Sequence, residues 1–201
     1  MDQLMARRAG FGLMAVMSLS LCRSGSLLVG DPALAVQGLG GITYFREVPR
    51  LSHSSVSPRT TRTRGATLQF TLDLPADAEE ALQTVVIEQS RNPEALRISP
   101  ERIRVVAGSR WHSEAPPIPA EVTLSKEARP QIEIRFTPAI AAGSTITIGL
   151  DPISTPQRSG TYLFGIHAQP VGERPFDYFL GYGSVGFDDS GGNQRIFLPH
   201  P

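Results

Sequence analysis

The chain has 201 residues, and 19 Lys and Arg residues balance 19 Asp and Glu residues, so its formal net charge is zero at pH 7. This balance excludes the strong positive field of a typical nucleic-acid-binding protein, and we expect no nucleic-acid partner. The single cysteine, Cys22, excludes an intramolecular disulfide and a cysteine-rich metal site.

The first 35 residues have the layout of an export signal. Arg7 and Arg8 precede an apolar run from Phe11 to Leu21. That run is too short for a bilayer-spanning helix, which needs about 20 apolar residues. Ala33-Leu34-Ala35 fits the small-x-small pattern that a signal peptidase cleaves. We therefore predict a signal peptide over 1–35, an exported domain over 36–201, and no transmembrane span after cleavage.

Two other export routes remain open. Cys22 could carry a lipid, although Leu21 before it is bulky where a small residue is usual. Arg7-Arg8 could belong to a twin-arginine signal, although the surrounding residues match that signal poorly. Each route leads to the same expectation, a protein that is periplasmic, on the cell surface or extracellular.

Short alternating segments separated by Pro and Gly recur through the exported part of the chain. In 68–74, Leu68, Phe70, Leu72 and Leu74 lie on one face of an extended chain and polar residues on the other. A short apolar and aromatic run at 42–45 precedes these segments, and in chain order we expect strands at 68–74, 84–88, 103–106, 122–124, 131–136, 145–150, 161–168 and 182–187.

Two intervening segments are expected to differ from strands. Residues 52–64 are rich in Ser, Thr and Arg around Pro58, which is typical of an irregular crossing segment. Residues 76–82 form the only convincing helical pattern, about two turns long.

About nine strands at this spacing predict one all-β domain, a single antiparallel β-sandwich, for which an immunoglobulin-like arrangement is one candidate. Its core is expected over about 43–187, with a polar tail over 188–201.

Residues 181–186 match the dinucleotide fingerprint G-x-G-x-x-G. That motif requires a strand before it and a helix N-terminus after it, where the pyrophosphate binds. Only fifteen residues follow, and they show no helical pattern. We therefore interpret these glycines as bends or close packing points in a strand.

Two further arrangements of reactive groups depend on the folded structure. Ser184, His167 and Asp177 are the groups of a hydrolytic triad, but a triad is defined by geometry, and sequence does not establish it. The acidic turn Asp188–Asn193 offers oxygen ligands for a calcium ion without the EF-hand order, and a solvated turn is the favoured interpretation.

Arginines and isolated aromatic residues are the remaining candidates for binding. Five arginines face a single acid within 46–64, so this strip could bind an anionic partner through paired guanidinium contacts; a solvated segment is the competing interpretation. Trp111 lies beside His112 in a Pro-rich loop, where an aromatic ring can contact carbohydrate or peptide. The candidate binding residues are Arg46, Arg50, Arg59, Arg62, Arg64, Trp111 and Tyr178.

The block 160–187 holds seven of the fourteen aromatic residues and carries a family resemblance. The residues concerned are Gly160–Gly165, Pro170–Glu173 and Phe179–Gly183, with support upstream from Pro49–Leu51, Gly65–Pro75, Leu82–Gln89 and Pro138–Leu150. In this order they resemble a family of exported cyanobacterial proteins classed as domain of unknown function 2808. The chain departs from the pattern at Ser184, where a basic residue is more usual, and at Leu68, where an aromatic residue is.

The resemblance implies a signal peptide followed by one β-rich domain, and it carries no activity, cofactor or catalytic residue. We therefore expect a non-enzymatic envelope or surface module that binds or supports an envelope component, either protein or polysaccharide, without a cofactor or metal. Two alternatives stay open. One is a hydrolase whose acid and base meet only in the folded chain, and the other is a small-ligand or ion carrier that uses the turn 188–193.

Overall fold

A computed structural model describes residues 40–90, 92–125 and 130–189. The predicted signal peptide, the alternative lipid site at Cys22 and most of the predicted tail lie outside these described residues.

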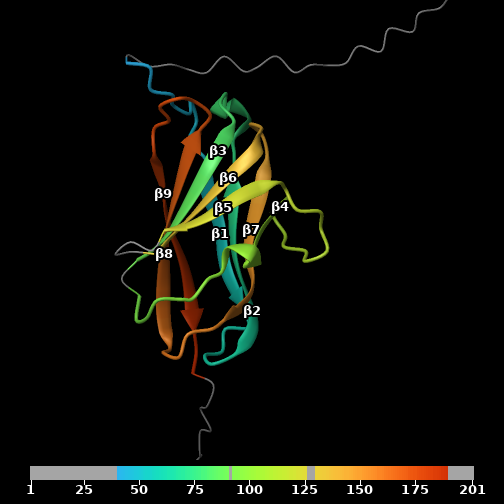
Figure 1. The fold of residues 1–201 in the computed structure, drawn as a ribbon, viewed down its shortest axis with the longest axis vertical. Helices are drawn as coiled ribbons and strands as arrows, with labels where there is room; N and C mark the ends of the chain where they lie inside the picture. The colour runs from blue at the N-terminus through green and yellow to red at the C-terminus, as the bar shows by residue number, and fades with distance from the viewer. Residues whose placement is uncertain (1–39, 91, 126–129, 190–201) are drawn as a thin grey trace, which may run out of the picture. The chain divides into compact units, whose positions relative to one another are not determined.

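Two antiparallel sheets contain the strands of the described residues (Figure 1). The first has the order β1-β2-β7-β4 and the second the order β5-β6-β3-β8-β9. All of the pairings within them are antiparallel. The strands are β1 (Arg50–Ser57), β2 (Arg64–Asp73), β3 (Leu82–Gln89), β4 (Ile103–Ala107), β5 (Ala120–Ser125), β6 (Gln131–Ile140), β7 (Thr145–Ser154), β8 (Gly160–Pro170) and β9 (Tyr178–Phe187).

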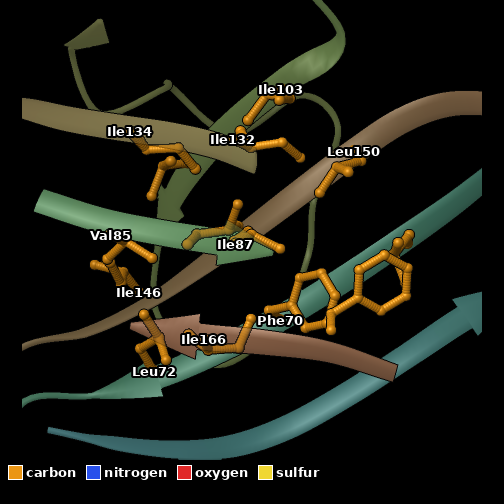
Figure 2. Close-up of a cluster of buried hydrophobic side chains, with 14 of the residues drawn as sticks. Phe70, Leu72, Val85, Ile87, Ile103, Ile132, Ile134, Ile146, Leu150 and Ile166 are labelled. Carbon is orange, nitrogen blue, oxygen red and sulfur yellow. The ribbon is translucent and has the colours of Figure 1, made fainter. Parts of the chain in front are cut away.

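The core lies between the two sheets because alternate residues of each strand point inward. Leu72 of β2 and Ile146 of β7 come from one sheet, and Val85 of β3 and Ile166 of β8 come from the other (Figure 2). The rings of Phe70 and Phe164 meet across the gap, with centroids 5.4 Å apart. Burial of these apolar side chains is the main stabilising term. The predicted antiparallel β-sandwich is confirmed.

The predicted helix at 76–82 is wrong. Only Ala76–Ala78 forms a single 3-10 turn (η1), in which the Ala78 N–H donates to the Pro75 carbonyl at 3.1 Å. Glu79 leaves this turn with a left-handed φ of 62°, and β3 begins at Leu82, which is 1% exposed. Burial of Leu82 in the core outweighs the helical preference, since so short a helix is unstable by itself.

One prediction near the start of the domain is also wrong. The apolar run at 42–45 makes an isolated bridge between Thr43 and Pro175. In 52–64 the expected irregular segment is occupied at its start by β1, which pairs with β2. Within β1 only Val56 is buried, so backbone pairing with β2 stabilises this strand where an alternating apolar face does not.

A β-bulge re-aims the side chains at the start of β9. Gly165 lies opposite Tyr182, whereas His167 lies opposite Phe179. Two residues further along β8 therefore correspond to three residues along β9, so β9 contains one extra residue here. Gly181 sits within this shift with φ 121°, a conformation that side chains rarely adopt. Residues three apart in a regular strand point to opposite faces, and the extra residue places Phe179 and Tyr182 on the same outer face.

Gly183 serves close packing. A Cβ built on it would lie 2.5 Å from Cε1 of Phe70, which is completely buried. Beside it, the Ser54 hydroxyl of β1 donates to the Ser184 carbonyl at 3.0 Å and accepts from the Ser184 N–H at 3.2 Å, which joins the edges of the two sheets. The interpretation of the glycine motif as a bend and a packing point is confirmed at Gly181 and Gly183.

Candidate functional site

The outer side of the β8–β9 hairpin exposes large apolar side chains. We define the aromatic face as Leu163, His167, Phe179 and Tyr182 around Gly165. Leu163, Phe179 and Tyr182 are 37%, 51% and 58% exposed. The rings of Phe179 and Tyr182 have centroids 5.0 Å apart and planes at 70°, and both pack over Gly165. Contiguous exposed apolar surface of this kind marks interaction sites.

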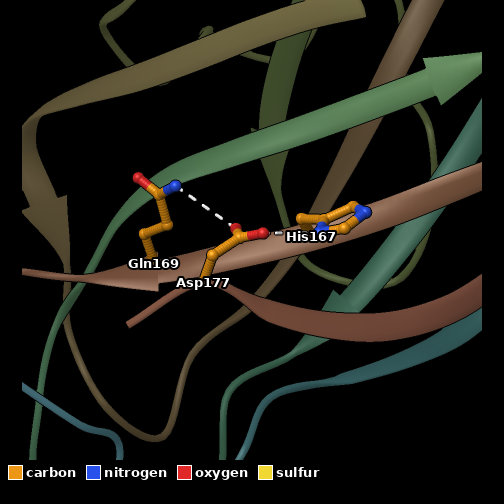
Figure 3. A network of polar contacts seen from close by, with 3 residues as sticks. All are labelled: His167, Gln169 and Asp177. Atoms are coloured by element: carbon orange, nitrogen blue, oxygen red, sulfur yellow. Dashed lines mark hydrogen bonds and ion pairs between the residues drawn. The ribbon is translucent and has the colours of Figure 1, made fainter. Parts of the chain in front are cut away.

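A polar network orients the histidine of this face (Figure 3). His167 Nδ1 and Asp177 Oδ2 are 2.8 Å apart, and Gln169 Nε2 donates to Asp177 Oδ1 at 3.2 Å. Both carboxylate oxygens are therefore engaged. The imidazole is held beside the Phe179 ring, with centroids 5.2 Å apart.

The structure brings together two of the three predicted triad residues. Ser184 lies opposite Leu163, which is four residues from His167 along β8. At about 3.3 Å per residue this is a separation of roughly 13 Å. The residues opposite His167 on the flanking strands are Val86 and Phe179, which carry no hydroxyl or thiol. Ser184 is thus out of reach of the His167–Asp177 pair, and the alternative in which these three residues form a triad is not supported.

Tyr178 belongs to a cluster of rings that ties the β8–β9 connection to the start of the domain. Its ring packs against Phe45 and Phe176, with centroids 5.5 and 4.7 Å away, and Tyr44 packs on Phe176. Its hydroxyl donates to the Phe45 carbonyl at 3.4 Å. Burial raises the pKa of Tyr178 above its ordinary value. These contacts give Tyr178 a structural role. Its predicted role in binding stays a prediction.

The five candidate arginines divide between the two ends of β1. Arg46 forms an ion pair with Glu79, whose hydrogen bond and charge raise the pKa of Arg46, and Arg50 is exposed at the first position of β1. Arg59 is exposed in the β1–β2 connection, where its carbonyl accepts a hydrogen bond from the Asp188 N–H at 2.9 Å. Arg62 lies in the same connection, and Arg64 is the first residue of β2.

Arg62 and Arg64 line a depression on the described surface. We call it the arginine depression, because Arg97 of the β3–β4 connection lines it as well. Its volume is about 780 Å³. Its lining residues lie where β7 ends and β2 begins, and the connections at this end of the sandwich are low in Figure 1. Segments far apart in sequence therefore place three guanidinium groups around one hollow.

Trp111, in the β4–β5 connection, lies over the outer side of the sheet β1-β2-β7-β4. Its indole covers the outer side of Gly149, where any side chain would overlap the ring. Arg104 clamps the loop that carries Trp111 by donating to the carbonyls of Ser113 at 2.5 Å and Ala115 at 3.0 Å. Trp111 also lines a depression of about 370 Å³ that includes Asp151 and His112. Trp111 and the three arginines thus line different depressions, and the aromatic face lies on the other sheet.

The acidic turn weighed as an alternative calcium site begins at Asp188, whose carbonyl accepts from the Thr61 N–H at 2.8 Å. Residues 190–193 of that turn lie outside the described residues. Nowhere in the described ranges do three or more His, Cys, Asp or Glu side chains gather as a metal site would require. In the same ranges, no helix has the length and apolar character needed to cross a membrane.

Sequence reasoning missed the outward side chains of the aromatic face and Arg97. Phe179 and Tyr182 are visible as aromatic residues, but their shared face depends on the bulge at Gly181. Arg97 gives no signal in its Pro-interrupted segment, because its proximity to Arg62 is a tertiary contact.

All of these surfaces lie on one domain of the antiparallel β-sandwich class. The family model described as protein of unknown function (DUF2808) matches residues 42–187, more than half of the chain. The chain therefore belongs to this family. The resemblance noted in the sequence is confirmed at the level of the family. A search of curated proteins gave no significant match.

Solved structures with similar folds include proteins of several bacteria. The collagen-binding domain of a Staphylococcus aureus adhesin has a TM-score of 0.37 and 7% identity, over 66% of this chain and 93% of that one. The N-terminal domain of a Streptococcus gordonii adhesin has a TM-score of 0.41 and 13% identity, over 72% of this chain and 33% of that one. A cohesin module from a Clostridium perfringens glycoside hydrolase has a TM-score of 0.38 and 11% identity, over 70% and 97%. Likeness at this level transfers no function.

Proposed function

We propose that this protein is an exported, non-enzymatic binding module of the cell envelope or surface, and that its aromatic face anchors an envelope protein. The observation that carries this proposal is the exposure of Phe179 and Tyr182, at 51% and 58%, on the same side of one hairpin. Interfaces concentrate their binding energy in a few aromatic side chains of this kind.

The geometry of the face favours a protein partner. A sugar ring stacks best on a flat aromatic platform, whereas the planes of Phe179 and Tyr182 are inclined at 70°. The two rings pack over Gly165, where ring carbons lie 3.5 and 3.7 Å from the position that a Cβ would take. The apolar side chains of a protein partner can pack against the outward surfaces of both inclined rings. His167, held by Asp177 at 2.8 Å, supplies a polar rim.

The proposal has a direct test in the cells that produce the protein. The full-length precursor is expressed with a C-terminal tag, the envelope is isolated, and material captured with the tag is identified. We expect the captured chain to begin near Val36 and to bring one envelope protein with it. Phe179→Ser and Tyr182→Ser should each weaken binding of that purified protein by about thirtyfold or more, as at an interface hot spot.

Phe176→Ser is the matched control. Phe176 is 44% exposed but packs against Tyr44 and Tyr178, away from the aromatic face. It should leave partner affinity unchanged while circular dichroism reports a folded chain for all three variants. Equal capture by all variants refutes the proposal, as does capture of polysaccharide alone. An uncleaved protein found in the cytoplasm refutes the exported location.

The His167–Asp177 pair gives the hydrolase alternative its own test. In a binding module, His167→Gln weakens partner binding modestly, since the ring only borders Phe179. In a hydrolase the same change abolishes turnover of the partner and leaves binding intact, because the general base is lost. Incubation of the purified partner with each form, followed by mass spectrometry of the partner, separates the two.

A further inference from the structure

The arginine depression carries an unbalanced positive charge. Arg62, Arg64 and Arg97 line it, and the acidic residue among its lining is Glu94. One oxygen of the Glu94 carboxylate accepts from the Gln157 N–H at 2.6 Å. Within the part of the chain that the structure describes, no ion pair engages the three guanidinium groups. They are therefore available to an incoming anion.

Part-buried hydrogen bonds hold the backbone that lines this depression. The Thr155 hydroxyl accepts from the Thr63 N–H at 2.8 Å and donates to the Thr63 carbonyl at 3.1 Å. Arg62 has a left-handed φ of 56°, and its N–H donates to the Pro156 carbonyl at 3.0 Å. The backbones that carry Arg62 and Arg64 are thus fixed before any ligand arrives, which lowers the entropy cost of binding.

A second set of bonds fixes the backbone beside Arg97. The buried Gln89 carboxamide accepts from the Leu96 N–H at 2.7 Å and donates to the Leu96 carbonyl at 2.8 Å. Leu96 itself is 5% exposed. The β3–β4 connection is therefore anchored to the core one residue before Arg97. The backbone from which the third guanidinium side chain extends is thus also fixed.

We propose that the arginine depression binds the carboxylate of an acidic saccharide. Guanidinium groups bind carboxylates through paired, charge-assisted hydrogen bonds, and a sugar adds hydroxyl groups that suit the Ser154 hydroxyl and the Gln157 carboxamide of the lining. The volume of about 780 Å³ is within the usual range of small-ligand sites, roughly 300–1,000 Å³. This site is separate from the aromatic face and does not depend on the function proposed for that face.

Isothermal titration calorimetry of the signal-free chain with trigalacturonate, at low salt, tests the proposal. We expect binding that weakens as salt is added, because the contact is ionic and exposed. Arg64→Gln and Arg97→Gln should each lower the affinity about tenfold. Arg59→Gln is the matched control, since Arg59 lies on the same connection as Arg62 but does not line the depression.

Maltotriose and inorganic sulfate separate the parts of the proposed chemistry. Maltotriose has the hydroxyl groups without a carboxylate, and sulfate has the charge without a sugar. Binding of maltotriose as tight as that of trigalacturonate overturns the role of the carboxylate, and equally tight sulfate binding overturns the role of the sugar. Failure of the wild-type chain to bind trigalacturonate at millimolar concentration overturns the proposal itself. Amide chemical shifts of Thr63 and Gln157 should move with trigalacturonate in the wild-type chain, independently of any variant.

Discussion

Replacement of Gly183 by alanine tests whether the glycine motif of β9 is a packing feature. The added Cβ would lie 2.5 Å from Cε1 and 2.8 Å from Cδ1 of Phe70, and 3.4 Å from Cβ of Ser54. Phe70 has little room to retreat, because it is completely buried and its ring packs on Phe164. Either the ring leaves its position or β9 moves away from β1.

The expected cost follows from these contacts. Overpacking of a filled core destabilises by about 1–3 kcal/mol. Alanine also restricts the unfolded chain relative to glycine, which returns about 0.4–1 kcal/mol. The free energy of unfolding of Gly183→Ala should therefore fall by about 1–2 kcal/mol, and the thermal midpoint by about 2–8 °C for a chain of this size.

Urea unfolding followed by circular dichroism measures the change, and Gly186→Ala provides the comparison. Gly186 is on the same strand and in the same motif, but a Cβ there meets nothing within 4 Å. It should be neutral or slightly stabilising. Equal stability of Gly183→Ala and the wild-type chain, or an equal loss in Gly186→Ala, would refute the packing argument.

Two further predictions concern buried polar groups. Gln89→Ala removes both hydrogen bonds to the Leu96 backbone. The free energy of unfolding, measured with urea, should therefore fall by about 1–3 kcal/mol. The same variant should bind trigalacturonate more weakly, and an unchanged affinity would contradict the anchoring of the β3–β4 connection. Burial raises the pKa of Tyr162 and Tyr178 above 10.0 in the folded chain. The stabilisation from the neutral hydroxyls is therefore present below pH 10 and is lost as the pH rises through the higher folded values. The thermal midpoint should fall above pH 10 together with phenolate absorbance, whereas phenolate absorbance that appears without any fall speaks against this linkage.

Alternation made the sandwich predictable from sequence. In 68–74, 131–136 and 145–150 the apolar residues recur at every second position, and each segment forms the inner side of a sheet. The same rule failed for β1, whose side chains are mostly polar, because a strand that is stabilised by pairing needs no apolar face. The prediction from sequence also failed at 76–82, because burial of Leu82 in β3 outweighs the weak helical preference of this segment.

The two proposed sites were predictable only in part. Arg62 and Arg64 stand out in a strip of arginines, but the hollow that they line exists because Arg97 and residues 154–157 reach the same end of the sandwich. Those segments are distant in sequence, and no local pattern records that they meet. The position of Trp111 over Gly149, in a different depression from the arginines, was equally unpredictable from the sequence.

Sequence alone determined the all-β class and the positions of most inner strands, because burial of one face imposes a period of two on the residues themselves. It also determined the family, through the order of segments between Ile42 and Phe187. The tertiary structure decided which outward residues share a surface. By counting along a regular strand, Phe179 and Tyr182 point to opposite sides. The bulge at Gly181 puts them on one side, and a register shift is a property of two paired strands that neither strand carries by itself.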